Sequence, residues 1–388
     1  MHIDIIGAGI GGLTTAIALK QQGFSVHVFE RAKEVKPVGA GIILGSNAMQ
    51  VYQSLGIAAQ LVEVGNPLDS MNVTREDLAL LSQVDLLPFK HKYGVPNLAI
   101  HRAALLNILL GKIEPHELSL GKQVKRVTSD TSTSVHFTDG STHMSDVLIA
   151  ADGIHSQVRN GLFPKVHTRD AGQWCWRGVL NHQLPNRYRQ ELNEAWGPTG
   201  RVGCVQINLQ QVYWYALTDV MGKAPPLDWK SGFNSFHPVL REILHLTPQE
   251  SIHFSHLIDI APMNHWFKGN VCLVGDAAHA TTPNLGQGAG QAIEDAYVLA
   301  SCMSNQRSVE AAFQNFQQIR IPKAHQVTNT SWQIGKMAHW QHPVAVWVRN
   351  TLMKLSPQQL SQRQAAQIYQ LPKLAQPFHL KPKTQYPT

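Results

Sequence analysis

The chain has 388 residues, of which 43 % are apolar and 15 % are charged. At roughly 150 residues per domain, this length predicts two domains or one large α/β unit with an inserted part. The apolar content is sufficient for a sizeable core and excludes a disordered chain. The net charge is +7, but residues 311–388 contain nine Lys or Arg and no Asp or Glu, which leaves 24 basic and 26 acidic residues in the first 310. Because the main body carries no basic excess, no nucleic-acid partner is expected.

Cysteine and histidine spacing argues against a disulfide framework and against a bound metal. The four cysteines have no C-x-x-C spacing, and the twenty histidines form no H-E-x-x-H motif. No run of 18 apolar residues exists, so no integral membrane association is expected. The apolar stretch 5–19 lacks the basic start of a signal peptide. We therefore expect a soluble cytoplasmic protein that is a monomer or a weak dimer.

The first thirty residues predict a dinucleotide site. Gly7 permits a tight turn, Gly9 lets a pyrophosphate approach the backbone, and Gly12 lets a helix pack closely on a strand. The helix N-terminus stabilises phosphate charge, and Glu30 is placed to accept hydrogen bonds from ribose hydroxyls. NAD and FAD share this motif, so it does not distinguish them. The order of elements is strand, glycine motif, helix, strand and acid, at residues 2–6, Gly7-x-Gly9-x-x-Gly12, 13–22, 25–29 and Glu30.

Two later segments repeat the pattern of a buried strand that ends in a polar loop. In V-L-I-A-A-D-G-I-H-S-Q-V-R, a strand runs into Asp152-Gly153 and then into a helix start. In V-C-L-V-G-D-A-A-H, a second strand ends in Gly275-Asp276, and a loop with the pattern P-x-x-G-Q-G then opens a long helix that reaches about Met303. With the glycine motif, these segments place three polar loops after three buried strands.

With these motifs in this order, roughly residues 3–320 resemble the single-component FAD-dependent aromatic hydroxylases, which are the class A flavoprotein monooxygenases. The resemblance implies an α/β fold with a discontinuous Rossmann-like FAD-binding domain, an antiparallel β-sheet substrate domain and a C-terminal helical segment. The expected division is residues 1–70, 101–170 and 268–318 for the FAD-binding domain, 71–100 and 171–267 for the substrate domain, and 319–388 for bridging and capping helices.

The resemblance also assigns cofactor roles. Arg102 is expected to reach the FAD phosphates, Asp276 to bind the ribityl chain, and Asp152 to serve both FAD and the nicotinamide cofactor. Glycines in the second loop leave backbone N–H groups free to face the flavin and stabilise its anionic reduced form. No second G-x-G-x-x-G exists, so NAD(P)H is expected as a transient reductant. The expected FAD residues are Gly7, Gly9, Gly12, Glu30, Arg31, Arg102, Val124, Asp152, Asp276, Pro283, Gly286, Gln287, Gly288 and Ala289.

The middle region predicts antiparallel strands at 174–180, 201–208 and 212–218. Alternation puts Arg201, Val205 and Ile207 on one face and Gln206 on the other, although a slip of one residue exchanges the faces. In the family that the chain resembles, such a sheet forms the floor of the substrate cavity. The candidates are Arg201 and Tyr213 for catalysis and Arg177, Gln206, Trp214 and Tyr215 for substrate contact.

The resemblance implies that NAD(P)H reduces FAD and that dioxygen forms a flavin hydroperoxide, which hydroxylates an aromatic, phenolic or enolic small molecule. Helices are expected at 308–340, 344–355 and 358–369, followed by a loop. An extra terminal helix also resembles the tetracycline-inactivating branch, so a polycyclic antibiotic substrate stays open. The alternative from another class is a FAD-dependent reductase or dehydrogenase without oxygen transfer. The basic C-terminal segment is expected either to steer an anionic substrate or NAD(P)H or to be a solvated face.

Overall fold

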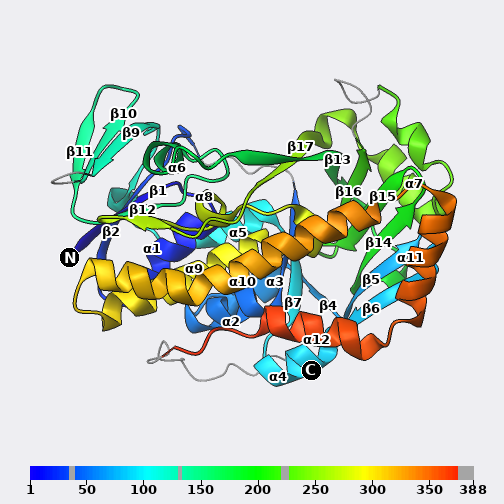
Figure 1. Cartoon of the computed structure of the whole chain (residues 1–388). Coiled ribbons are helices and arrows are strands. Elements are labelled where there is room, and N and C mark those ends of the chain that lie inside the picture. The colour runs from blue at the N-terminus through cyan, green and yellow to red at the C-terminus, as the bar shows by residue number, and fades with distance from the viewer. Residues whose placement is uncertain (35–39, 130–132, 220–226, 375–388) are drawn as a thin grey trace.

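The fold is described by a computed structural model that covers residues 1–34, 40–129, 133–219 and 227–374. Two large sheets lie side by side, and the long helix α10 (Val309–Ala338) runs along the molecule past both of them (Figure 1). The expected α/β class with a parallel sheet, antiparallel sheets and C-terminal helices is confirmed.

The six-stranded sheet carries the N-terminal motif. β1, β2, β12 and β19 pair in parallel, and only β18 runs antiparallel, at the edge. The apolar runs that make these strands are buried, and helices α1 (Ile10–Gln21) and α9 (Gly288–Asn305) pack against each other in the same core. The strands in spatial order are β18 (Phe267–Lys268), β19 (Val271–Leu273), β12 (Leu148–Ala150), β1 (His2–Ile6), β2 (Ser25–Phe29) and β8 (Leu118–Ser119).

The seven-stranded sheet is antiparallel except where β14 pairs with β5 in parallel. The predicted hairpin forms between β15 and β16, with Gly203 opposite Tyr215 and Val205 opposite Tyr213. One face is covered by aromatic and aliphatic side chains, together with η3 (Trp229–Phe233) and α7 (Pro238–Leu246). The strands in spatial order are β17 (Ile252–Ile260), β13 (Thr168–Asn181), β16 (Gln211–Asp219), β15 (Gly200–Gln206), β14 (Glu191–Gly197), β5 (Ser70–Arg75) and β6 (Leu80–Asp85).

The remaining strands of the described residues form two small sheets. One has the order β3 (Gly41–Leu44), β7 (Asn97–His101) and β4 (Asn66–Leu68), and the other has the order β11 (Thr142–Ser145), β10 (Thr133–Phe137) and β9 (Val124–Ser129). The remaining short helices are α2 (Ser46–Ser54), α3 (Ala58–Val64), α4 (Leu87–Tyr93), α5 (Arg102–Leu110), α6 (Gln157–Leu162), α8 (Asp276–His279), η1 (Pro115–Glu117), η2 (Asn186–Tyr188), η4 (Gln249–Ser251) and η5 (Pro283–Leu285).

Three helices end the described chain. α10 continues through Pro322 without a break, and α11 (Pro343–Leu355) and α12 (Gln358–Tyr369) follow it along β6. Tyr369, at the end of α12, lies edge-on to Phe89 and is buried. Part of the loop expected after α12 lies outside the described residues. Within the described ranges, no helix is both long enough and apolar enough to cross a bilayer.

Candidate functional site

The turn between β1 and α1 has the geometry that the glycine motif predicts. Gly7 has φ +104°, and a Cβ there would lie 2.4 Å from the carbonyl oxygen of Ala151. A Cβ on Gly12 would lie 1.9 Å from the carbonyl oxygen of Gly7, so the helix is seated directly on the strand. A Cβ on Gly9 would meet no atom within 4 Å. The loop is therefore closed on the protein side and open at Gly9, where a phosphate fits against the helix N-terminus.

The carboxylate of Glu30 ties this loop to the end of β2. It accepts hydrogen bonds from the backbone N–H groups of Ala8, at 2.8 Å, and Ala32, at 2.9 Å. Each carboxylate oxygen keeps a lone pair for a ribose hydroxyl. Arg31 is exposed beside it, whereas Val124 is buried at the start of β9.

The second loop leads from β19 to α9 and bends at two glycines. Gly275 has φ +58° and Gly286 has φ +61°, a region that favours residues without a Cβ. α9 begins at Gly288, and its preceding residue, Gln287, accepts a hydrogen bond from Asn47 at 3.1 Å. Pro283 opens η5, and Ala289 is half-buried in the first turn of α9. The loop therefore presents the start of a long helix, as the sequence predicted.

Asp276 begins α8, shortly after the end of β19. Its side chain is exposed to solvent, and desolvation by the protein around it raises the pKa of the carboxyl group. The positive charges of His279 and Arg102 oppose that increase in pKa. Arg102, at the start of α5, is exposed. Because the charge of Arg102 acts on Asp276, the first helix turn of α5 lies near the G-D motif.

Asp152 lies at the end of the third strand. One carboxylate oxygen accepts hydrogen bonds from the N–H groups of Gln157, at 2.9 Å, and Val158, at 3.3 Å. The other oxygen is buried and has no hydrogen-bond partner among the described residues. Buried polar atoms are normally satisfied, so this oxygen fits a ligand contact. Arg159 is instead occupied by the carbonyl oxygens of Ala277 and Ile154, so it braces the two loops.

A buried ionic network holds the second loop in place. Arg320 of α10 donates to Asp295 at 2.7 Å and to Glu294 at 2.8 Å, and all three side chains are fully buried. Asp295 also accepts from the N–H of Gly275 at 2.8 Å and from His279 at 2.5 Å. Although burial acts to raise it, the pKa of Asp295 is lowered by His279 and Arg320. This network was not among the sequence-based predictions, although two acids within the apolar helix after Gly288 are a visible signal for it.

On the seven-stranded sheet, Arg201 is paired with a carboxylate. It is buried, donates to Glu194 at 3.1 Å, and also donates to the side chain of Asn284 in η5. Glu194 accepts further hydrogen bonds from the hydroxyl of Tyr215 and from the indole of Trp196. The charge of Arg201 is therefore compensated, and its side chain connects the sheet to the second loop. Glu194 and Asn284 were not among the predicted residues.

Tyr213 and Arg177 share the face of Arg201. The ring of Tyr213 lies against Gly41 of β3, where a Cβ would come within 2.4 Å of it. Burial raises the pKa of Tyr213, while the charges of Arg177 and Arg102 act in the opposite direction. Arg177 donates to the sulfur of Cys175 at 3.2 Å and to the hydroxyl of Ser255 at 3.1 Å. This face of the sheet is therefore turned toward β3 and the second loop.

Two predicted substrate residues belong to the opposite face. Trp214 is fully buried between sheet and α7, and its indole donates to Thr247 at 2.7 Å. The amide of Gln206 donates to three backbone carbonyls and accepts from the N–H of Leu184. Because the side-chain period of a strand is two, neither residue reaches the face of Arg201, and we remove both from the candidate site.

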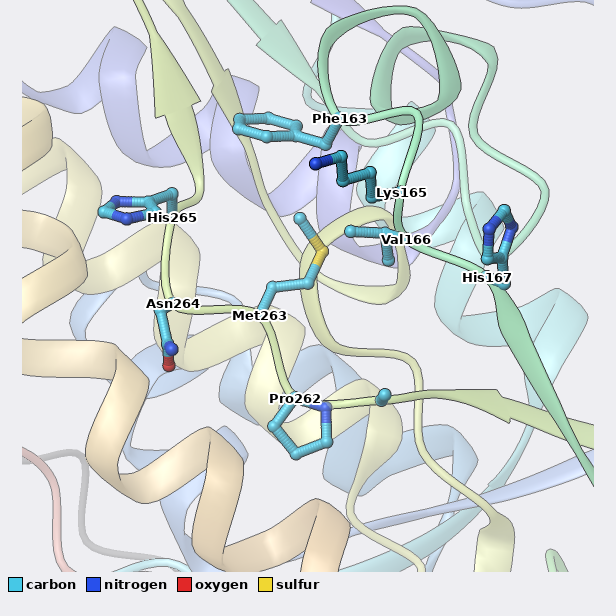
Figure 2. A pocket seen from close by; sticks show the side chains of 9 residues that line it. Phe163, Lys165, Val166, His167, Pro262, Met263, Asn264 and His265 are labelled. Carbon is cyan, nitrogen blue, oxygen red and sulfur yellow. The ribbon is translucent and has the colours of Figure 1, made fainter.

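A cavity of about 340 Å³ lies between two loop segments of the chain (Figure 2). Its lining comes from the segment after α6 and from the segment between β17 and β18, and none of the predicted site residues lines it. Its side chains include Lys165, His167 and His265. Within the described parts of the chain, no group of three or more His, Cys, Asp or Glu side chains forms a metal site.

Comparison with known proteins gives consistent results. The FAD binding domain family matches residues 1–331. The chain is 34 % identical over 361 residues to "Aurachin C monooxygenase/isomerase" of Stigmatella aurantiaca, covering 92 % of this chain and 94 % of the relative. It is 32 % identical over 368 residues to "2-heptyl-3-hydroxy-4(1H)-quinolone synthase" of Pseudomonas aeruginosa, again covering 92 % and 94 %.

Solved structures share the fold over nearly the whole chain. Klebsiella pneumoniae HpxO complexed with FAD and uric acid superposes with a TM-score of 0.88 at 26 % identity, covering 95 % of this chain and 96 % of that chain. Tetracycline destructase Tet(51) superposes with a TM-score of 0.68 at 20 % identity, covering 93 % and 97 %. The second likeness shows the fold alone.

Proposed function

This chain belongs to the FAD binding domain family of FAD-dependent monooxygenases, and on that premise we propose that it hydroxylates an aromatic heterocycle with an ionisable ring oxygen and an apolar substituent. The substrate class follows the Pseudomonas relative, whose name specifies a heptyl-bearing hydroxyquinolone. FAD, when bound, supplies the oxygen-activating chemistry. Gly7, Gly9, Gly12, Glu30, Asp152 and Asp276, with Arg102 and the loop Pro283–Ala289, are the residues that we expect to hold it.

The observation that carries the substrate class is the difference between the two arginines of the sheet. Arg201 is neutralised by Glu194, whereas Arg177 has only neutral hydrogen-bond partners among the described residues. A half-buried guanidinium without a carboxylate favours an anionic oxygen nearby. Arg177 is thus suited to stabilise the deprotonated oxygen of a ring, and deprotonation makes that ring more electron-rich.

The surroundings of Tyr213 support the apolar substituent. Val205 and Ile207 of the sheet, Tyr369 of α12 and Ala99 of β7 belong to the same buried apolar cluster as Tyr213. This packed apolar cluster borders the face of the sheet that carries Arg177, and it favours a substrate with an apolar part and keeps water away from the reacting ring. Tyr213 lies on the same face of the sheet as Arg177, and the charges of Arg177 and Arg102 both act on its hydroxyl group, so we propose that this hydroxyl contacts the ring oxygen.

The proposal includes NAD(P)H as the transient reductant, dioxygen as co-substrate, and a cytoplasmic monomer or weak dimer. Substrate-dependent NAD(P)H oxidation with incorporation of labelled oxygen into the product tests it against a reductase without oxygen transfer. A panel of quinolones, phenolic acids, urate and tetracyclines, with product mass as readout, identifies the substrate class. A product heavier by one oxygen atom from tetracycline alone would contradict the heterocycle proposal.

Substituting Arg177 with methionine is expected to lower kcat/KM for a quinolone-type substrate by about 10- to 150-fold, the range for losing a hydrogen bond to a charged group. The acid limb of the kcat profile should move to higher pH, because the cation no longer lowers the pKa of the bound ring oxygen. Steady-state kinetics measured from about pH 6 to about pH 10, in steps of about one pH unit, give both kcat/KM and the position of the acid limb.

Arg126→Met is the matched control, since Arg126 is exposed on β9 in a different sheet. It should leave both the rate and the pH profile unchanged. A lower rate for Arg177→Met with an unshifted pH profile would assign Arg177 to packing of the sheet and remove the charge argument.

A further inference from the structure

The outer face of α11 is apolar and exposed. Five side chains on successive turns point away from the protein and are between 37 % and 75 % exposed. At 100° per residue they form one stripe along the helix. We call it the α11 stripe, and it consists of Val344, Trp347, Val348, Leu352 and Leu355. Trp340 before the helix and Leu360 after it are also exposed, at 44 % and 50 %.

The opposite face of α11 is anchored, so the stripe is held outward. Arg349 is buried and donates to the carbonyl oxygens of Ala338, at 3.0 Å, and Met337, at 3.2 Å. Its guanidinium lies over the ring of Trp196, 5.0 Å from the centroid. The helix packs along β6 at the end of the molecule that is farthest from β1 and β2 (Figure 1). Rotation that buried the stripe would break these contacts.

The C-terminal segment that carries the stripe has charges of one sign, although Asp219 contacts Gln341 before α11. Residues 311–388 contain nine Lys or Arg and no Asp or Glu. Lys354 is exposed two turns after Trp347 at the edge of the stripe, and Lys336 and Arg363 are exposed on the neighbouring helices. An apolar helix face with tryptophan and flanking cations is the pattern of a helix that lies in a membrane interface.

We propose that the α11 stripe docks the enzyme on the surface of a membrane that contains anionic lipid. The apolar side chains would enter the interface, and the basic segment would lie over the negative headgroups. A second copy of the chain fits less well, because a symmetric contact through α11 would bring two segments of the same positive sign together. The proposal stands apart from the proposed substrate, since it depends only on α11 and its flanking charges.

Co-sedimentation of the full chain with vesicles tests the docking. We expect binding to vesicles of equal parts phosphatidylglycerol and phosphatidylcholine, weaker binding at high salt, and little binding to phosphatidylcholine alone. The affinity of the double variant Trp347→Ser/Leu352→Ser for the anionic vesicles should fall by about tenfold or more, because two apolar side chains no longer enter the interface. Its flavin absorption and its rate on a soluble substrate should match those of the unchanged protein.

Leu209→Ser is the matched control, since Leu209 is 86 % exposed in the turn between β15 and β16. It should bind vesicles as the unchanged protein does. Equal loss of binding in this control, or no binding of the unchanged protein to anionic vesicles, overturns the proposal. A dimer in light scattering that the double variant abolishes, with no vesicle binding, would assign the stripe to a second copy instead.

Discussion

Replacing Arg320 with methionine will lower the free energy of unfolding by about 3–5 kcal/mol, because it leaves two buried carboxylates with too little positive charge. Arg320 is fully buried and donates to both Asp295 and Glu294. Of the two acids, Lys323 contacts Glu294, at 2.7 Å, so Asp295 would keep His279 as its side-chain partner among the described residues. Because Asp295 also holds the N–H of Gly275, FAD affinity should fall together with stability. Urea unfolding followed by tryptophan fluorescence, and flavin retention on gel filtration, measure the two effects.

The matched control is Arg363→Met on the exposed side of α12. Its free energy of unfolding should stay within about 0.5 kcal/mol of the unchanged protein. A second variant, Arg320→Met with Glu294→Gln, should recover part of the loss, since one of the unpaired charges is then removed. A loss below about 1 kcal/mol for Arg320→Met would mean that water screens the network as it screens a surface ion pair.

Replacing Asp276 with asparagine is expected to weaken FAD binding by about 10- to 150-fold without destabilising the protein. The carboxylate is the acceptor that we propose for the ribityl hydroxyls, and a neutral amide is a weaker acceptor. The pKa of Asp276 is raised in the folded protein, so ionisation of this group opposes folding. The variant should therefore be equally stable or slightly more stable near neutral pH, with a small gain because solvent reaches the side chain. Fluorescence titration with FAD gives the affinity.

The pH dependence separates the two contributions of Asp276. With its pKa raised on folding, stability falls as pH rises from the ordinary aspartate pKa through the raised value. In the absence of FAD, the melting temperature of Asp276→Asn should therefore rise relative to that of the unchanged protein as the pH increases through this interval. Above the raised pKa, the difference should stay constant. Asp146→Asn, in the loop before β12, is the control. Unchanged FAD affinity in Asp276→Asn would remove this residue from the cofactor site.

The sequence predicted most of the fold because its signals are local. Gly7 and Gly12 mark a strand, a turn and a helix within about twenty residues, and no distant contact is needed to place them. The alternation along β15 also predicted the two faces, since Val205 and Ile207 lie in one apolar cluster and Val202 and Cys204 in another, whereas the register of the hairpin was left open. The one 30-residue helix α10 was expected as helical throughout, and Pro322 did not interrupt it.

The parts that could not be predicted depend on contacts across the sequence. Arg320 and Glu294 are brought together only when α10 packs on α9, and their residue types do not specify each other as partners. Gln206 was a reasonable polar candidate, but its amide is taken up by backbone carbonyls of its own turn and of His182, after β13. Of the nine cations in the basic segment, Arg320, Lys323 and Arg349 have partners inside the fold. Fewer charges are therefore available to attract anionic molecules than the composition indicates.

Asn284 connects the two halves of the candidate site. Its oxygen accepts from Arg201 of the sheet, and its amide donates to Thr282 in its own loop, at 2.9 Å, and to Ser331 of α10, at 2.8 Å. A shift of this loop between two positions would change substrate binding on the sheet and FAD binding at the loop together. Thermodynamic linkage makes such coupling between two binding sites reciprocal. Whatever factor a substrate on the sheet adds to the affinity for FAD, FAD must add the same factor to the affinity for that substrate. Asn284 is the side chain through which such coupling would pass directly from the sheet to the loop.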